Sequence, residues 1–491
     1  MGSKAPKFEP LERLDLRKRQ TVGQIVDGMS RCSFGARMLG EVAQTLTDWA
    51  KDPKRRPAVI YTGKPSTPLG QLLREMVRRR WFSRLLTPEA YPKAKRVSGN
   101  VVVVGFFTET QAQVLYRKPE RAIFINSAGL AKPGQVMDGW FPDAVFADPA
   151  FVMPVLFLTL EERLEGRRAS VKELIKMLKG YGGLADEVVH GAETFVTMVE
   201  NPECTVFLTL SGAMTIAKMG LVICEMIDRE MVHAIASTGA LMAHGLIESV
   251  GLAHYRYNPK ISDRILARKK LNRVTDALEP ETNFDHIEEI LDRVLWDISE
   301  KTLLSPRTFH RMIGAYLAKH YPNERGILKS AFEKDVPVFV PAFHDSEIGN
   351  DLFVHNQKRR RRKLARLVMD IELDSEYLVK RVARAKRIGI FSIGGGVPRN
   401  NIQNVAPMIE IMNQRLGTHF PEHKFFYGCR ICPDPMWYGH LSGCTYSEGA
   451  SWRKMDLGGR FSAIHADATQ VWPFLVRLVM DKQDHNLHSS S

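Results

Sequence analysis

The chain has 491 residues, of which 44% are hydrophobic and 25% are charged, and its formal net charge is +14. This composition is ordinary for a soluble globular protein, and the six scattered cysteines exclude a disulfide framework and suit a reducing cytoplasm. No run of 18 or more apolar residues and no apolar secretory segment are present, so neither a membrane span nor export is expected.

Four short apolar runs in the first third of the chain are typical of buried β-strands: residues 58–63, 100–107, 121–127 and 144–148. The charged stretch LEERLEGRRASVKEL, residues 160–174, follows them and is predicted to be a connector. We therefore expect an additional N-terminal α/β region over residues 1–165, whose role the sequence does not indicate, and a larger domain over residues 166–485.

Six further runs of the same kind lie in the larger part: residues 205–210, 231–237, 336–343, 387–393, 424–432 and 461–466. Most of them are apolar on both faces, as strands inside a parallel sheet are, and helical patterns such as 214–230 and 285–300 lie between them. The sequence therefore predicts a doubly wound, mainly parallel, Rossmann-like α/β domain.

Small, polar and acidic residues follow every one of these runs, in the segments SGAM (211–214), TGAL (238–241), HDSEIGND (344–351), GGGVPRNN (394–401), PDPMWYGHLSG (433–443) and DAT (467–469). The carboxyl ends of the strands of an open α/β sheet form its ligand crevice. Glycines there let the backbone approach phosphate, and helix N-termini attract anions. A dinucleotide is therefore a reasonable ligand, although no G-x-G-x-x-G sequence is present.

Six segments in order carry a more specific signal between about residues 170 and 480: CTVFLTLSGAM, ASTGALMAHGLIE, VPVFVPAFHDSEIG, IGGGVPRN, GHLSGCTYSEGASWRKM and HADATQVWPFL. This series resembles the deoxyhypusine synthase family, and more closely its bacterial deoxyhypusine synthase-like members. The resemblance covers some 300 residues and does not extend over residues 1–165.

The resemblance implies a transferase that uses NAD and a polyamine, and no metal. In this family the secondary amine of spermidine is oxidised to an imine, diaminopropane leaves, and the aminobutyl group passes to an enzyme lysine as a Schiff base. It then moves to an acceptor amine, which is a protein lysine in deoxyhypusine synthase and putrescine in homospermidine synthases. The resemblance also implies a homotetramer with active sites at a dimer interface.

Lys454 stands where the family has its imine-forming lysine, in the segment SEGASWRKM. A lysine must be neutral to attack an imine carbon, and burial or a nearby cation can bring this about by lowering its pKa. Trp452 offers an apolar wall and a π-face for an alkylammonium group, and Glu448 can bind an ammonium group or carry protons. The alternative is a core tryptophan beside a surface lysine.

Other positions carry over from the family one by one. The residues expected to contact NAD are Ser211, Gly212, Ala213, Ser237, Thr238, Gly239, Asp345, Asp467 and Ala468. An acid such as Asp345 suits the ribose hydroxyls of the cofactor. The residues expected at the amine site are His244, Asn350, Gly395, Asn400 and Leu441.

Several amine-site positions depart from the family pattern. Ala243 and His244 stand where the eukaryotic enzyme has two glutamates, Asn350 and Leu441 each replace an aspartate, and Asn400 replaces a histidine. Loss of carboxylates weakens the grip on a multiply charged amine. The sequence thus predicts alkylamine transfer through NAD and a lysine imine on a different amine pair, or a homospermidine synthase-type reaction with a small amine acceptor.

Two other functions fit parts of the sequence. Cys429, Cys432, Cys444 and His440 could suggest a zinc site, but residues i and i+3 of a strand point to opposite faces, so no metal is expected. A non-catalytic partner or regulatory paralogue could use the N-terminal region and the basic run KRRRRK (358–363) to bind a partner. Such a run is more often a solvated face, and nucleic acid is not the expected ligand.

Overall fold

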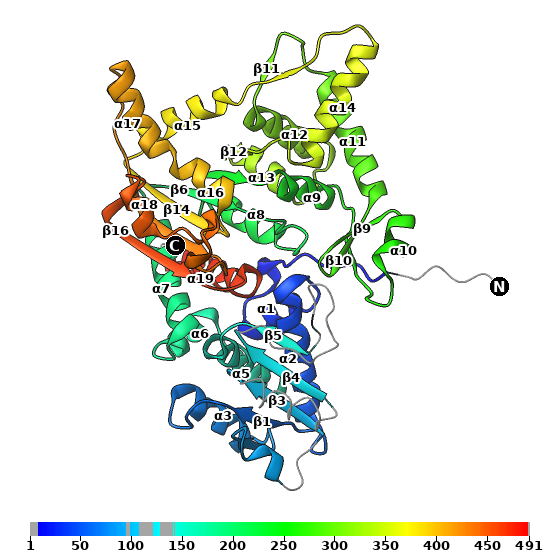
Figure 1. The fold of residues 1–491 in the computed structure, drawn as a ribbon, viewed down its shortest axis with the longest axis vertical. Helices are drawn as coiled ribbons and strands as arrows, with labels where there is room; N and C mark the ends of the chain where they lie inside the picture. Colours follow the sequence, from blue (N-terminus) through cyan, green and yellow to red (C-terminus); the bar gives the residue numbers. More distant parts are fainter. Residues whose placement is uncertain (1–7, 95–98, 108–120, 128–140, 142, 490–491) are drawn as a thin grey trace, which may run out of the picture. The chain divides into compact units, whose positions relative to one another are not determined.

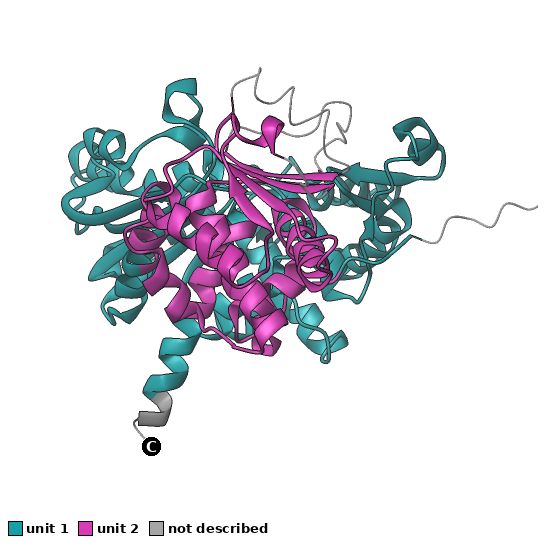
Figure 2. Ribbon diagram, turned by 90° about the horizontal axis from the view of Figure 1, so that it is seen from below, with its two compact units in different colours: residues 1–11, 193–468, 479–491 teal, residues 12–192, 469–478 magenta. Residues whose placement is uncertain are grey.

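The computed structural model describes residues 8–94, 99–107, 121–127, 141 and 143–489 (Figure 1). The chain divides into two compact units, which Figure 2 shows in different colours. The first unit comprises Met1–Leu11, Glu193–Ala468 and Val479–Ser491, and the second comprises Glu12–Ala192 and Thr469–Leu478. The separate roles expected for residues 1–165 and 166–485 stay a prediction.

The first unit is built on a six-stranded sheet with the order β12-β7-β6-β14-β15-β16, in which every pairing is parallel. Its strands are β6 (Cys204–Leu210), β7 (Ala234–Ser237), β12 (Val338–Phe339), β14 (Arg387–Ile393), β15 (Phe425–Ile431) and β16 (Met455–Ile464). The chain runs outward from β6 to one edge, returns to β14 beside β6, and continues to the other edge. The predicted doubly wound, mainly parallel fold is confirmed.

Helices connect these strands: α8 (Gly220–Asp228), α9 (Gly239–Ser249), α11 (Glu281–Trp296), α12 (Pro306–His320), α13 (Ile327–Glu333), α14 (Glu347–Arg361), α15 (Glu372–Arg384), α16 (Gly396–Gln403), α17 (Val405–Leu416) and α18 (Tyr446–Ser451). Phe207 of β6, Ile390 of β14 and Phe425 of β15 pack with Ile402 of α16 and Ile409 of α17 in one buried core. On the other face, the ring of Phe391 of β14 lies 4.4 Å from that of Phe195, so both faces of the strands are covered, as their continuous apolar runs predict.

Shorter elements of the first unit are β8 (Tyr255–Arg256), α10 (Asp263–Arg268), β9 (Leu271–Val274), β10 (Ala277–Pro280), β11 (Leu303–Leu304) and β13 (Val368–Met369). The strands β8, β10 and β9 form a small antiparallel sheet, and β11 pairs with β13. None of these strands is among the apolar runs predicted from the sequence, because strands of two to four residues carry too few positions to show a period.

The second unit contains a parallel five-stranded sheet with the order β2-β1-β3-β4-β5. Its elements are α1 (Val22–Met29), α2 (Phe34–Lys51), β1 (Ala58–Tyr61), α3 (Pro68–Arg78), β2 (Arg84–Leu86), β3 (Asn100–Val104), β4 (Arg121–Asn126), β5 (Ala144–Phe146), α5 (Pro149–Glu165) and α6 (Val171–Leu178). The helices α7 (Gly183–Glu200) and α19 (Ala468–Ser489) contribute residues to both units. No helix among the described residues is both long and apolar enough to span a bilayer.

Several predicted boundaries were wrong, and three of them have a clear physical reason. The connector expected at 160–174 is mostly helical, because α5 ends at Gly166 in the left-handed region and Ser170 caps α6 through a capping box with Glu173. The helix expected over 214–230 covers only α8, since Lys218 before it adopts a φ of 69°. The strand expected over 336–343 is two residues long, because prolines on both sides of β12 lack the N–H group that a ladder needs.

Candidate active site

One cavity of about 460 Å³ lies where the order of the six-stranded sheet reverses, beyond the carboxyl ends of β6 and β14. We call it the glycine cavity. Its lining includes Ser211, Gly212, Ser237, Thr238, Gly239, Asp345, Gly394, Gly395, Gly396, Asp434 and Ser442. Ligands of doubly wound sheets bind at such a switch point.

Close backbone packing shapes the glycine cavity. Gly394 and Gly396 have φ angles of 71° and 66°, which L side chains rarely adopt. A Cβ on Gly395 would lie 2.4 Å from the Cα of Ser442, and one on Gly239 would lie 2.3 Å from the Cβ of Ser346. The loop after β14 can therefore approach Ser442, and the loop after β7 can approach Ser346, only because these positions have no side chain.

One serine hydroxyl and one threonine hydroxyl link the loops after β6, β7 and β14. Ser211 donates to the carbonyl oxygen of Gly395, and Thr238 donates to that of Gly212 at 2.8 Å. Asp345 is exposed at the cavity, directly before the Ser346 that caps α14. Backbone close to the cavity and an exposed carboxylate suit a ligand that carries phosphates and sugar hydroxyls.

A second cavity, of about 320 Å³, shares Gly396 with the first. We call it the lysine cavity. Its lining consists of Gly396, Arg399, Asn400, Gln403, Asn404, Leu441, Cys444, Glu448, Gly449, Trp452 and Lys454. The side chains come from α16 and from the segment 441–454, which contains α18, so two stretches that are distant in the sequence form it together.

Lys454 has a fixed backbone and a partly buried side chain. Its N–H donates to the carbonyl oxygen of Gly449 at 3.0 Å, and its own carbonyl oxygen accepts from the N–H of Phe425 at 3.0 Å. Its Nζ donates to Oδ1 of Asn400 at 2.7 Å and lies 5.7 Å from the ring centroid of Trp452. A single conformation of the main chain therefore presents this amine to the cavity.

The pKa of Lys454 lies below its usual value. Burial is the largest cause, and the positive charge of Arg399 acts in the same direction, while the neighbouring Cys444 and Glu448 oppose it. A lower pKa increases the fraction of the neutral amine, which is the form that attacks carbonyl and imine carbons. The lysine cavity therefore contains a potential nucleophile.

A family model described as deoxyhypusine synthase matches residues 173–479. A Methanosarcina acetivorans protein named "Probable deoxyhypusine synthase 2" is 30% identical over 319 residues, which is 65% of this chain and 89% of that protein. The chain belongs to the deoxyhypusine synthase family. The "Deoxyhypusine synthase-like protein" of Coxiella burnetii is 26% identical over 64% of this chain and 87% of that protein.

Most residues that the family resemblance singled out line one of the two cavities. Lys454, Glu448, Trp452, Asn400 and Leu441 line the lysine cavity, and the glycine cavity has Ser211, Gly212, Ser237, Thr238, Gly239, Asp345 and Gly395 in its lining. Glu448 is exposed on α18, where its N–H donates to the capping hydroxyl of Thr445 at 3.1 Å. Trp452 is 63% exposed, so its ring is available to a ligand rather than part of the core.

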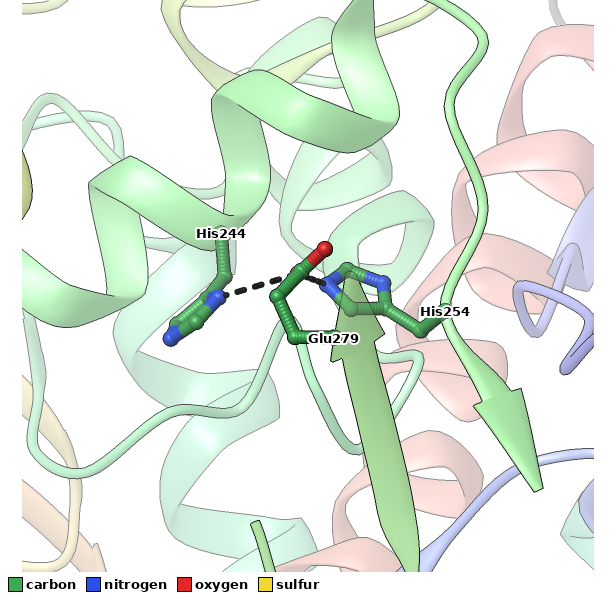
Figure 3. A group of neighbouring side chains, drawn as sticks. All are labelled: His244, His254 and Glu279. Atoms are coloured by element: carbon green, nitrogen blue, oxygen red, sulfur yellow. Dashed lines mark hydrogen bonds and ion pairs between the residues drawn. The ribbon is translucent and has the colours of Figure 1, made fainter. Parts of the chain in front are cut away.

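Five of the residues that the family resemblance singled out line neither cavity, as far as the described residues show. Ala213 follows Gly212 in the loop after β6, and Asp467 and Ala468 follow β16. Asn350 is exposed on α14. His244 lies on α9 and is buried in a network of polar side chains, which Figure 3 shows. The roles given to these five residues stay predictions.

The network around His244 resembles a metal site in its composition. Nδ1 of His244 lies 3.3 Å from a carboxylate oxygen of Glu279, and Nε2 of His254 contacts the same oxygen. The ligand atoms of the three residues lie within 4.8 Å of one another, and all three residues are buried. Two imidazoles and a carboxylate are also the ligands of many zinc sites.

The position of Lys218 favours a hydrogen-bond network over a metal site at His244, His254 and Glu279. Its Nζ donates to Glu248 at 2.8 Å and lies 2.6 Å from Nδ1 of His254. Burial lowers the pKa of His254, so its ring is neutral, and a ring that accepts from the ammonium at Nδ1 carries its proton on Nε2, against Glu279. Metal binding at Nε2 would require the ring proton to move to Nδ1. There it would face the ammonium group of Lys218, and Nδ1 could no longer accept from that group.

Sequence reasoning missed Arg399, which lines the lysine cavity, and Arg430, which lies beside it. Arg399 belongs to the glycine-rich segment GGGVPRNN, so its position was visible in the sequence. Arg430 lies within β15 among apolar residues, and a charged residue inside a predicted buried strand was a signal that could have found it.

Proposed function

We propose that this protein is an NAD-dependent alkylamine transferase that acts on a polyamine and holds the transferred group as an imine on Lys454. Aminobutyl transfer is the activity of its family. The observation that carries the proposal is the pair of adjoining cavities, one lined by glycine loops at the switch point and the other by a lysine with a lowered pKa.

NAD fits the glycine cavity. The loops around Gly212, Gly239 and Gly395 would hold its phosphates, and Asp345 would accept from ribose hydroxyls. When bound, NAD supplies the hydride acceptor for the oxidation of an amine and the donor for the later reduction.

The residues of the lysine cavity have separate tasks in this proposal. Lys454 would add to the imine carbon of the oxidised amine, whose original nitrogen would then leave as a free amine, and Asn400 would hold Nζ through the bond at 2.7 Å. Trp452 covers the alkyl chain and attracts an ammonium group to its ring face. Glu448 binds the ammonium end or takes the proton that leaves the attacking amine.

Two measurements test the proposal. Titration calorimetry should show NAD binding that is weaker in Asp345→Ala, and no binding at high micromolar NAD would reject the cofactor. Borohydride should trap a supplied alkyl group on Lys454. In Lys454→Arg, transfer should fall by about three orders of magnitude while NAD still binds, because a guanidinium stays protonated. Transfer near the wild-type rate in Lys454→Arg would reject the imine.

The acceptor and the assembly are part of the same proposal. The acceptor is a protein lysine or, in the homospermidine synthase-type alternative, a small amine, and mass spectrometry of reactions with spermidine, putrescine and agmatine distinguishes the two. The enzyme is expected to be a cytoplasmic homotetramer, and a monomer in light scattering would contradict this. A non-catalytic partner protein would instead bind NAD without trapping any group on Lys454.

A further inference from the structure

Two buried arginines at or beside the lysine cavity have no carboxylate partner among the described residues. Arg399 and Arg430 are each 2% exposed, and no acidic side chain of the described residues forms an ion pair with either. Nη1 of Arg399 donates to the carbonyl oxygen of Cys444 at 2.9 Å. Nη1 of Arg430 donates to the same oxygen at 2.7 Å and to that of Ser442 at 2.8 Å.

Three other donors of these guanidinium groups have no hydrogen-bond partner among the described residues. Nε and Nη2 of Arg399 and Nε of Arg430 are buried without a hydrogen-bond partner. Nε and Nη2 form one edge of a guanidinium group, and this edge matches the two oxygens of a carboxylate or phosphate group. Arg399 therefore has a whole bidentate edge without a partner, and a buried unpaired charge with unmade hydrogen bonds is costly.

The charges around the lysine cavity favour an anion as well. Its lining contains two basic side chains, Arg399 and Lys454, and one acidic side chain, Glu448, which is exposed. The ring of Tyr446 lies 5.2 Å from the guanidinium carbon of Arg399 and supplies only a π-face. A substrate with ammonium groups at both ends would meet one carboxylate and an uncompensated arginine.

We infer that one of the two amines that react at Lys454 carries a carboxylate or phosphate group, which binds Arg399. This inference rests on the proposed function and names the substrate class of the same site. The ammonium end of such a zwitterion lies toward Glu448 and Trp452, and its anionic end replaces the missing partner of the guanidinium group. The anion neutralises a charge that the chain itself leaves uncompensated.

A matched series of four-carbon amines tests the inference by titration calorimetry. 4-Aminobutanoate, 1,4-diaminobutane and 1-aminobutane share one amine end and differ at the other, which is a carboxylate, an ammonium or a methyl group. The wild type should bind 4-aminobutanoate about tenfold more tightly than the other two, the usual size of a charge-assisted bond. Equal or tighter binding of 1,4-diaminobutane would overturn the inference.

Variants test whether Arg399 causes the preference for 4-aminobutanoate. Arg399→Gln should abolish it, and Arg399→Lys should restore part of it, since an ammonium keeps the charge without the fork. Arg453→Gln is the control, because it removes a charge next to Lys454 that pairs with Glu410 at 2.9 Å. Arg453→Gln should keep the preference of the wild type. A preference that survives in a folded Arg399→Gln protein would overturn the assignment.

Two further arms separate the possible causes. Saturating NAD should leave the preference intact, whereas its loss would show that a cofactor phosphate occupies Arg399 and would overturn the inference. Borohydride trapping of butanal tests the lysine independently: its amine adds to the carbonyl carbon, water leaves, and hydride reduces the imine to a secondary amine. Failure of trapping with a retained preference would reject the proposed function alone, and the reverse result would reject the inference alone.

Discussion

Lys218 and Arg399 are both buried cations of the first unit, and their surroundings differ. Lys218 donates to the carboxylate of Glu248 and contacts the neutral ring of His254, through which the network continues to Glu279, so its charge has a partner of opposite sign. Arg399 contacts a carbonyl oxygen and an aromatic ring and has no carboxylate partner among the described residues. The difference indicates that the first group of charges stabilises the fold, whereas the second is completed by a ligand.

The largest expected effect is on the stability of the network that contains Lys218, whose charge is paired. Glu279→Leu leaves two buried imidazoles and the Asn283 amide without the carboxylate that they share, so the free energy of unfolding should fall by about 3–5 kcal/mol in chemical denaturation, at about 1–3 kcal/mol for each unpaired group. Glu281→Leu is the control two residues later. Its carboxylate is 44% exposed, so the loss should be below about 1 kcal/mol. Equal losses would mean that the network adds no stability.

His310 tests a third way of burying a titratable group, in which the group stays neutral. Burial lowers its pKa to about 4, although its Nδ1 interacts with the carbonyl oxygen of Pro306. The folded pKa is below the unfolded value of about 6.5, so stability is present above pH 6.5 and is lost as the pH falls toward 4. The loss should reach about 3 kcal/mol.

His310→Asn should remove this part of the pH dependence, because an amide keeps a donor near Pro306 and does not titrate in this range. The measurement is the free energy of unfolding at several pH values between 7 and 4 in both proteins. Parallel curves for the wild type and the variant would show that His310 is not kept neutral by the fold.

A carboxylate placed in the lysine cavity should make it resemble the compensated network. Leu441→Asp adds a negative charge near Lys454 and Arg399, which should raise the pKa of Lys454. The pH at which butanal is trapped on Lys454 should then rise by about one unit, and the preference for 4-aminobutanoate should decrease about tenfold. Leu416→Asp at the exposed end of α17 should change neither quantity.

The smallest expected change is the one that tests the comparison most directly. Arg399→Met replaces an uncompensated buried cation by an apolar side chain, so the free energy of unfolding without ligands should stay the same or rise by about 1 kcal/mol. Chemical denaturation of the two proteins measures this. A fall of several kcal/mol would show that Arg399 is already compensated in the free protein.

Backbone features of the site were more predictable than its side-chain partners. The runs that became β6, β14 and β15 and the glycine loop at Gly395 could be located, because burial and close packing leave local patterns in the sequence. The pairing of Lys218 with Glu248 and His254 joins three separate segments, which no local pattern reports. The same pairing accompanies the loop that replaced the predicted helix at 214–219.

The family resemblance singled out Lys454 and missed its surroundings for the same reason. Lys454 was identified from its own segment, whereas Arg399 and Arg430 come together only when α16 and β15 pack beside the segment 441–454. Charge balance in a cavity depends on several distant segments. Substrate preference is therefore harder to predict from a single chain than the position of a reactive residue.

The two main-chain bonds of Lys454, to Gly449 and from Phe425, give its side chain a fixed pivot. In the proposed reaction, an amine on such a pivot can turn from one bound partner to the other without any movement of the sheet edge, because this reorientation needs only side-chain torsions, which change within nanoseconds. Among the movements of a turnover, the slowest is then expected to be the exchange of amines through the opening of the cavity. Viscosity should therefore slow the steady state more than it slows a single transfer.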